Sequence, residues 1–168
     1  MHDAGLTIQE GEEGTTPRRI VFDDVDALYC SVTDLPWKFM TVTLVTFAGV
    51  RWTVPRDLEE RSLLLAAIER KVTAPLRREA AASHARGEPL TFGPVVVTSN
   101  GLTLEGDVTC WSDLSHVVVE KQVVVFHARE PRGRLRWLAL AKIPHPRILF
   151  ALLQMHGQVV FDEREWLE

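Results

Sequence analysis

The chain has 168 residues, of which 46% are hydrophobic and 25% are charged, and its formal net charge at pH 7 is -4. This composition is ordinary for a globular domain, and the acidic balance argues against a general nucleic-acid binder, which normally presents a basic stripe. The N-terminal stretch MHDAGLTIQEGEEG has neither the basic nor the apolar region of a signal peptide, and no apolar run is long enough to span a membrane. We therefore expect a cytoplasmic chain.

The N-terminal part of the chain reads as strands separated by polar turns. Three segments, at 17–30, 38–47 and 50–54, are rich in β-branched and aromatic residues. Asp23 and Asp24 interrupt the first segment and indicate a bend or bulge. The glycine-bearing stretch GEEGTTP before them predicts a loop.

A change of period after Pro55 predicts a long helix. Asp57 has the spacing of an N-cap residue with its capping partner, and apolar residues then recur at helical intervals along one stripe. We expect Pro75 to kink this helix, because proline cannot donate the hydrogen bond of a helix interior. Gly87 is a natural C-terminal stop.

Strand-like segments return after Gly87 and continue to about residue 143. The turns between them contain Asn-Gly, Glu-Gly-Asp and Pro-Arg-Gly, which all favour tight reversals of the chain. The stretch PHPRILFALLQMHG, at 144–157, then predicts a short helix with a proline in its first turn. The tail at 158–168 is expected to add one further strand.

Four landmarks recur in the same order in the two halves of the chain. A Gly-Leu-Thr motif is followed by an aromatic–x–Asp–aliphatic motif, a tryptophan, and a proline that precedes a helix. The matched residues are Gly5 with Gly101, Phe22 with Trp111, Trp52 with Trp137, and Pro55 with Pro144. This ordered self-similarity predicts an internal duplication, and we expect the matched aromatic residues to lie in two cores.

The order of these motifs, with a GL strand, a W-S-D-L strand and an I-P-x-P helix entry, resembles the pleckstrin-homology-like (PH-like) domains of bacteria. It looks most like an uncharacterised group of actinobacterial-type proteins that carry two such units joined by a long helix. The resemblance implies an α+β fold of tandem PH-like open β-barrels, each followed by a C-terminal helix. It implies a first unit over 1–87, which ends in the long, Pro75-kinked helix, a second unit over 88–157, and a tail over 158–168.

One strand edge of the first unit is expected to be uncovered. The second unit carries LTFGPVVVTSN before its GL strand, whereas the first carries only MHDA, so the resemblance implies that the first unit lacks its opening strand. Because an uncovered edge readily pairs with another chain, we expect the tail or a second copy to cover it, and a homodimer is one outcome. The candidate contact residues are Leu6 and Ile8 on this edge, and Trp37 and Trp166, which have no counterpart in the repeat.

The sequence gives no reason to propose an enzyme. It contains no GxSxG, phosphate-binding glycine loop, HExxH motif or Cys/His cluster with zinc spacing. The paired Asp23 and Asp24 are expected to point to opposite faces of a strand, so they are poor partners for proton transfer. The two cysteines, Cys30 and Cys110, lie outside any CxxC motif; we expect buried reduced thiols, and a disulfide stays open. We predict no catalytic residue, no metal and no cofactor.

These features favour a non-catalytic binding or scaffolding module that acts through protein–protein contact and self-assembles by completing a strand edge. The alternative is peripheral recognition of an anionic lipid or a phosphate by the hairpin AREPRGRLR, because clustered guanidinium groups bind phosphate well. Its arginines are Arg129, Arg132, Arg134 and Arg136. We expect no nucleic-acid partner, and membrane contact only at the periphery.

Overall fold

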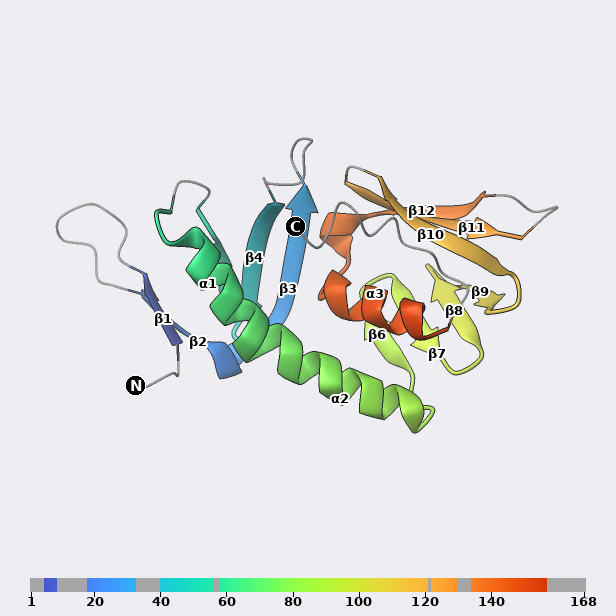
Figure 1. Cartoon of the computed structure of the whole chain (residues 1–168), viewed down its shortest axis with the longest axis horizontal. Coiled ribbons are helices and arrows are strands. Elements are labelled where there is room, and N and C mark those ends of the chain that lie inside the picture. The colour runs from blue at the N-terminus through green and yellow to red at the C-terminus, as the bar shows by residue number, and fades with distance from the viewer. Residues whose placement is uncertain are drawn as a thin grey trace.

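The computed structural model of the chain describes residues 5–8, 18–32, 40–55, 58–120, 122–129 and 134–156. An N-terminal half and a C-terminal half lie side by side, and a long helix runs from the first to the second (Figure 1). Each described half contains two antiparallel sheets and its own buried apolar cluster.

The N-terminal half holds a two-stranded and a three-stranded sheet. The first consists of β1 (Gly5–Ile8) and β2 (Arg18–Val21), and the second of β3 (Val25–Val32), β4 (Met40–Thr46) and β5 (Arg51–Thr53). A 3₁₀ turn, η1 (Phe22–Asp24), links them, and the register of β3 shifts between Val25 and Ala27. The bend predicted at Asp23 and Asp24 is therefore present, and both side chains are exposed.

The predicted long helix is present and consists of three consecutive parts. These are α1 (Arg61–Ile68), a π-helical turn η3 (Glu69–Thr73) and α2 (Ala74–Ala85). Pro75 lies in the first turn of α2, and the widened π-helical turn directly before it accommodates the residue that lacks an N–H donor. Gly87 follows the helix with φ of 80°, in the left-handed region that favours glycine. The predicted N-cap, Asp57, lies outside the described residues.

The C-terminal half contains a four-stranded and a three-stranded sheet, followed by a helix. The first sheet consists of β6 (Leu90–Phe92), β7 (Val95–Thr98), β8 (Gly101–Leu104) and β9 (Asp107–Cys110). The second consists of β10 (Leu114–Glu120), β11 (Val123–Ala128) and β12 (Arg134–Ala139). A 3₁₀ turn, η4 (Leu140–Lys142), leads to α3 (Pro146–Met155), which begins at a proline as predicted.

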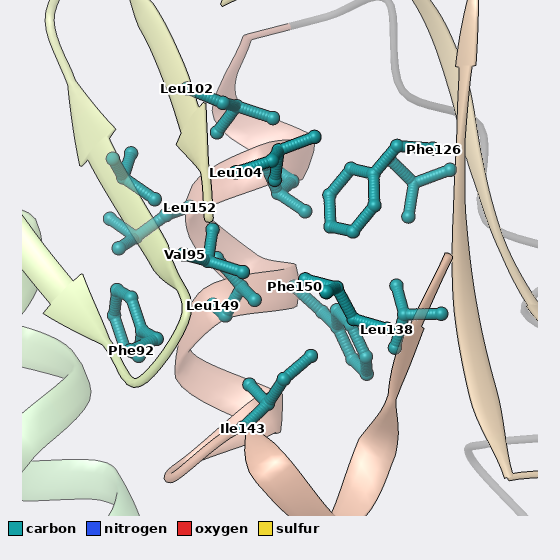
Figure 2. Close-up of a cluster of buried hydrophobic side chains, with 14 of the residues drawn as sticks. Phe92, Val95, Leu102, Leu104, Phe126, Leu138, Ile143, Leu149, Phe150 and Leu152 are labelled. Atoms are coloured by element: carbon teal, nitrogen blue, oxygen red, sulfur yellow. The ribbon is translucent and has the colours of Figure 1, made fainter. Parts of the chain in front are cut away.

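The larger apolar core lies between the two sheets of the C-terminal half, with α3 running through it (Figure 2). Leu102 and Leu104 reach into it from β8, and Phe126 and Leu138 reach into it from β11 and β12 (Figure 2). The smaller core forms where the long helix covers the β3–β4–β5 sheet. Leu76 packs against both cores, so one helix serves both halves of the chain.

The expectation of tandem PH-like open barrels, each followed by its own C-terminal helix, is wrong. The described strands form four antiparallel sheets of two, three, three and four strands, and none closes into a barrel. Among these strands β9 pairs only with β8, and β10 pairs only with β11, so no ladder joins the two sheets of the C-terminal half. The long helix lies in the middle of the chain, and its apolar side chains pack against two cores. Apolar patterns show which face a strand buries, but not which strand edges pair.

The matched landmarks of the two halves occupy similar places. Each half has a strand pair, a turn and a three-stranded sheet, and the strand after the turn shifts register at the matched points Val25/Ala27 and Leu114/His116. The match of Trp52 with Trp137 is wrong by one residue, however. Trp52 lies opposite buried Leu44, whereas Trp137 lies opposite Val125, and Arg136 is the residue opposite buried Phe126. A one-residue slip places a side chain on the other face of a sheet.

Candidate functional site

One candidate contact surface in the described part of the chain is the side of the β10–β11–β12 sheet that faces away from the core. We call it the outer face and define it by His116, Val118, Val123, Val125, His127, Trp137 and Ala139, which occupy the strand positions between the core-facing ones. In an antiparallel sheet with one buried face, the other face is normally polar. Here β10 and β11 each contain a run of three valines instead, so apolar side chains lie on both faces of the sheet.

Trp137 lies on the outer face of β12, an edge strand of the sheet. It pairs with Val125 in the ladder, and Val125 in turn pairs with Val118. Val125 is buried, whereas 58% of Trp137 remains exposed. A large aromatic side chain held on a rigid strand, with apolar neighbours, has the character of an anchor residue in a protein interface.

Two imidazole rings lie at one end of the outer face. His116 and His127 are directly opposite each other on β10 and β11, and their rings stack with centroids 4.2 Å apart and planes 7° apart. The Nδ1 atom of His116 is 3.1 Å from the hydroxyl of Ser115. The exposed Arg129 follows just beyond β11, and its backbone N–H donates to the carbonyl oxygen of Asp113.

A second histidine cluster joins the ends of α2 and α3. The Nε2 atoms of His84 and His156 are 2.8 Å apart, and the ring of His156 stacks on Trp111 at 3.8 Å. The Nδ1 atom of His84 is buried without a partner among the described residues. Because a buried N–H without an acceptor costs more than a bare lone pair, we assign the Nε2–H donor to His84 and the acceptor to His156. Burial, and then the charge of His84, lower the pKa of His156.

His145 fastens the start of α3 to the N-terminal half. Its backbone N–H donates to the carbonyl of Leu28 at 2.7 Å, and its Nε2 lies 2.9 Å from the carbonyl oxygen of Asp26. Arg147 adds a 3.0 Å ion pair to Glu69 in the π-helical turn. Burial lowers the pKa of His145, although the hydrogen bond to Asp26 opposes this shift.

Residues 1–160 match a protein family that is described as a family of unknown function, DUF6585. The chain belongs to this family. It matches no curated protein. Membership of DUF6585 therefore adds no activity or partner to the geometry described above.

The arginines of the predicted anion site are only partly covered by the described residues. In this DUF6585 chain Arg136 forms ion pairs with Glu105, at 3.3 Å, and with Asp107, so its charge is already balanced by the β8–β9 turn. The backbone N–H of Arg129 donates to the carbonyl of Asp113. Arg134 begins β12, but its side chain lies outside the described part of the structure, as does the whole of Arg132. The anion alternative therefore stays a prediction.

Two of the four predicted protein-contact residues lie outside the described residues. Leu6 and Ile8 are in β1, which pairs only with β2 among the described strands, so the covering of its edge stays a prediction. Trp37 and Trp166 are outside the described residues. The sequence-based predictions did not include the outer face. The valine runs in β10 and β11 could have indicated it, because three successive valines in a strand place apolar side chains on both faces of the sheet.

The described residues do not form a recognisable catalytic or metal-binding site. They contain no group of three or more metal-ligating side chains, and none of their helices is long and apolar enough to cross a membrane. Both cysteines are free thiols; Cys30 is buried, whereas Cys110 is exposed, so the expectation of two buried thiols is wrong for Cys110. Burial raises the pKa of the Cys30 thiol to about 12, so this group is a poor nucleophile.

Proposed function

We propose that this DUF6585 protein is a non-catalytic, cytoplasmic binding module that acts by self-association, with its outer face as the contact surface. The observation that carries the proposal is Trp137, which is 58% exposed on a sheet face where its neighbours Val118 and Val125 are apolar. Water exposure of the Trp137 side chain is unfavourable, and burying it against a partner recovers hydrophobic free energy.

Charge complementarity favours a second copy of the chain as the partner. Three basic residues, His116, His127 and Arg129, lie at one end of the outer face, beside one acidic residue, Asp113. The whole chain carries a formal net charge of -4, so the rest of its surface supplies the acidic groups that would complement this end. Attraction of this kind orients the encounter and suppresses wrong partners.

Replacing Trp137 by alanine is expected to weaken self-association by at least about tenfold, since an aromatic anchor residue typically contributes more than 1.4 kcal/mol. Sedimentation equilibrium over a concentration series measures the dissociation constant directly. Val108→Ala is the matched control, because Val108 is an apolar strand residue that is 79% exposed on the other sheet of the same half.

The control variant should associate like the parent chain. Equal dissociation constants for the parent and the Trp137→Ala variant, or a monomeric parent chain at the highest concentration, would overturn the proposal.

A further inference from the structure

A further exposed apolar group lies at the turn between β4 and β5. We call this turn the tip and define it by Phe47, Ala48, Gly49 and Val50. Phe47 is 72% exposed and Val50 is 48% exposed. The backbone N–H of Thr46 donates to the carbonyl of Val50 at 3.0 Å, and that of Gly49 donates to the carbonyl of Thr46 at 2.8 Å. The tip is therefore a hydrogen-bonded hairpin turn that presents two apolar side chains to solvent.

Two exposed carboxylates lie beside the tip. The backbone N–H of Phe47 donates to the carbonyl oxygen of Asp24 at 3.0 Å, which joins the tip to η1, and Asp23 and Asp24 are both exposed. Neither carboxylate forms an ion pair with another side chain that the structure describes. The basic Arg51, which follows the tip, lies with its guanidinium carbon 5.7 Å from the ring centroid of Tyr29. The tip and η1 thus form one patch that is both apolar and acidic.

This patch complements the outer face in charge and in spacing. On the outer face Trp137 pairs with Val125, and His127 lies two residues further along β11, a distance of about 7 Å. At the tip, the exposed ring of Phe47 likewise lies next to charged groups, because its backbone is bonded to Asp24. Each surface therefore places an aromatic group beside charges, and the charges on the two surfaces are of opposite sign. Apolar contact flanked by attraction of opposite charges is typical of specific protein interfaces.

We infer that the tip of one copy binds the outer face of a second copy, with the apolar residues of the tip against Trp137 and with Asp23 and Asp24 toward the imidazole pair. This inference rests on the proposed self-association and names the part of the second copy that makes the contact. Phe47 and Trp137 are both largely exposed in the single chain, so neither covers the other within one copy. Because the tip and the outer face are different surfaces, the contact is heterologous, and it closes into a ring or continues from copy to copy.

Complementation between two full-length variants tests the inference. The face variant carries Trp137→Ala, and the tip variant carries Phe47→Ser together with Val50→Ser. Each alone is expected to associate at least about tenfold more weakly than the parent chain, because every contact that it can form includes one damaged surface. An equimolar mixture should form a complex of two chains at a total concentration where each variant alone is monomeric. In this complex the intact tip of the face variant binds the intact outer face of the tip variant, and light scattering measures its mass.

Leu63→Ser is the matched control for the tip variant. Leu63 is an apolar residue of α1 that is 66% exposed and belongs to neither surface. This control is expected to associate like the parent chain, and a control as weak as the tip variant would overturn the assignment of the tip. Circular dichroism checks that all variants remain folded.

The outcomes separate this inference from the proposed function. If both variants lose association and their mixture regains it, the tip is the partner of the outer face. If only the face variant loses association, self-association through the outer face stands and the assignment of the tip is wrong. If both variants lose association but the mixture does not regain it, direct binding of the tip to the outer face is overturned. If the face variant associates like the parent chain, both proposals fall.

Discussion

Replacing Gly101 by alanine is expected to lower the free energy of unfolding by about 3 kcal/mol, because the added methyl group overlaps a neighbouring strand. Gly101 begins β8 and pairs with Cys110 of β9. A Cβ atom at this position would lie 2.8 Å from the Cα of Cys110 and in hard contact with the carbonyl oxygen of Thr109. These are backbone atoms fixed in a hydrogen-bonded ladder, so they cannot move aside as a flexible side chain would.

Urea denaturation of the parent chain and the variant measures this difference. Val108→Ala in β9 is the control, because this exposed residue loses apolar surface without meeting the backbone of β8. Its effect should stay below about 0.5 kcal/mol, as for most surface substitutions. A Gly101→Ala variant that is no less stable than the Val108→Ala variant would show that the two strands separate more easily than their pairing implies.

The same glycine shows what the sequence could reveal about the fold. The recurrence of Gly-Leu-Thr at residues 5 and 101 indicated two equivalent strand starts, and each does begin a strand of an antiparallel pair. The strand content and the long helix were also readable, because β-branched runs, the change of period and Gly87 act locally. The sheet boundaries were not readable. Whether β9 bonds to β10 depends on edges brought together by the whole fold, and no local pattern encodes that.

The candidate site was only partly predictable for a related reason. Trp137 was expected in a core because it was matched to Trp52, yet a one-residue difference in register places it on the outer face. The valine runs of β10 and β11 do indicate a sheet that is apolar on both sides. In contrast, His84 and His156 are 72 residues apart in the chain, so nothing local in either helix pointed to their contact.

Acidification below pH 6.5 is expected to destabilise the protein, because α3 is held at both ends by histidines that prefer to be neutral. The pKa of His145 and that of His156 are both lowered from the ordinary value of 6.5, mainly by burial. In the interval between each lowered value and 6.5, the unfolded chain binds more protons than the folded one. The stabilising contribution of the two neutral histidines is therefore fully present above pH 6.5. It is lost progressively as the pH falls from 6.5 through their pKa values in the folded protein.

The two ends respond to protonation for different reasons. At His156, an added proton on Nε2 would face the Nε2–H of His84 across 2.8 Å, so the hydrogen bond would be replaced by repulsion. At His145, the Nε2–H already donates to the Asp26 carbonyl, and an added proton would lie on Nδ1, which is buried without a described partner. The charged groups around this end are Asp26 and the Arg147–Glu69 pair.

Two substitutions isolate this contribution from the titration of the carboxylates. His156→Phe keeps an aromatic ring on Trp111, and His145→Asn keeps a residue that tolerates the left-handed backbone, with φ of 49°, at the start of α3. Removing one titrating histidine can lower the slope of the unfolding free energy against pH by at most about 1.4 kcal/mol per pH unit. Solvent screening makes the contribution of the partly exposed His156 smaller than this limit. Urea denaturation at a series of pH values between 7 and 5 should therefore give a flatter profile for the double variant than for the parent chain. Parallel profiles would mean that α3 is held by its apolar face alone, and that the histidines at its two ends do not make its attachment sensitive to acid.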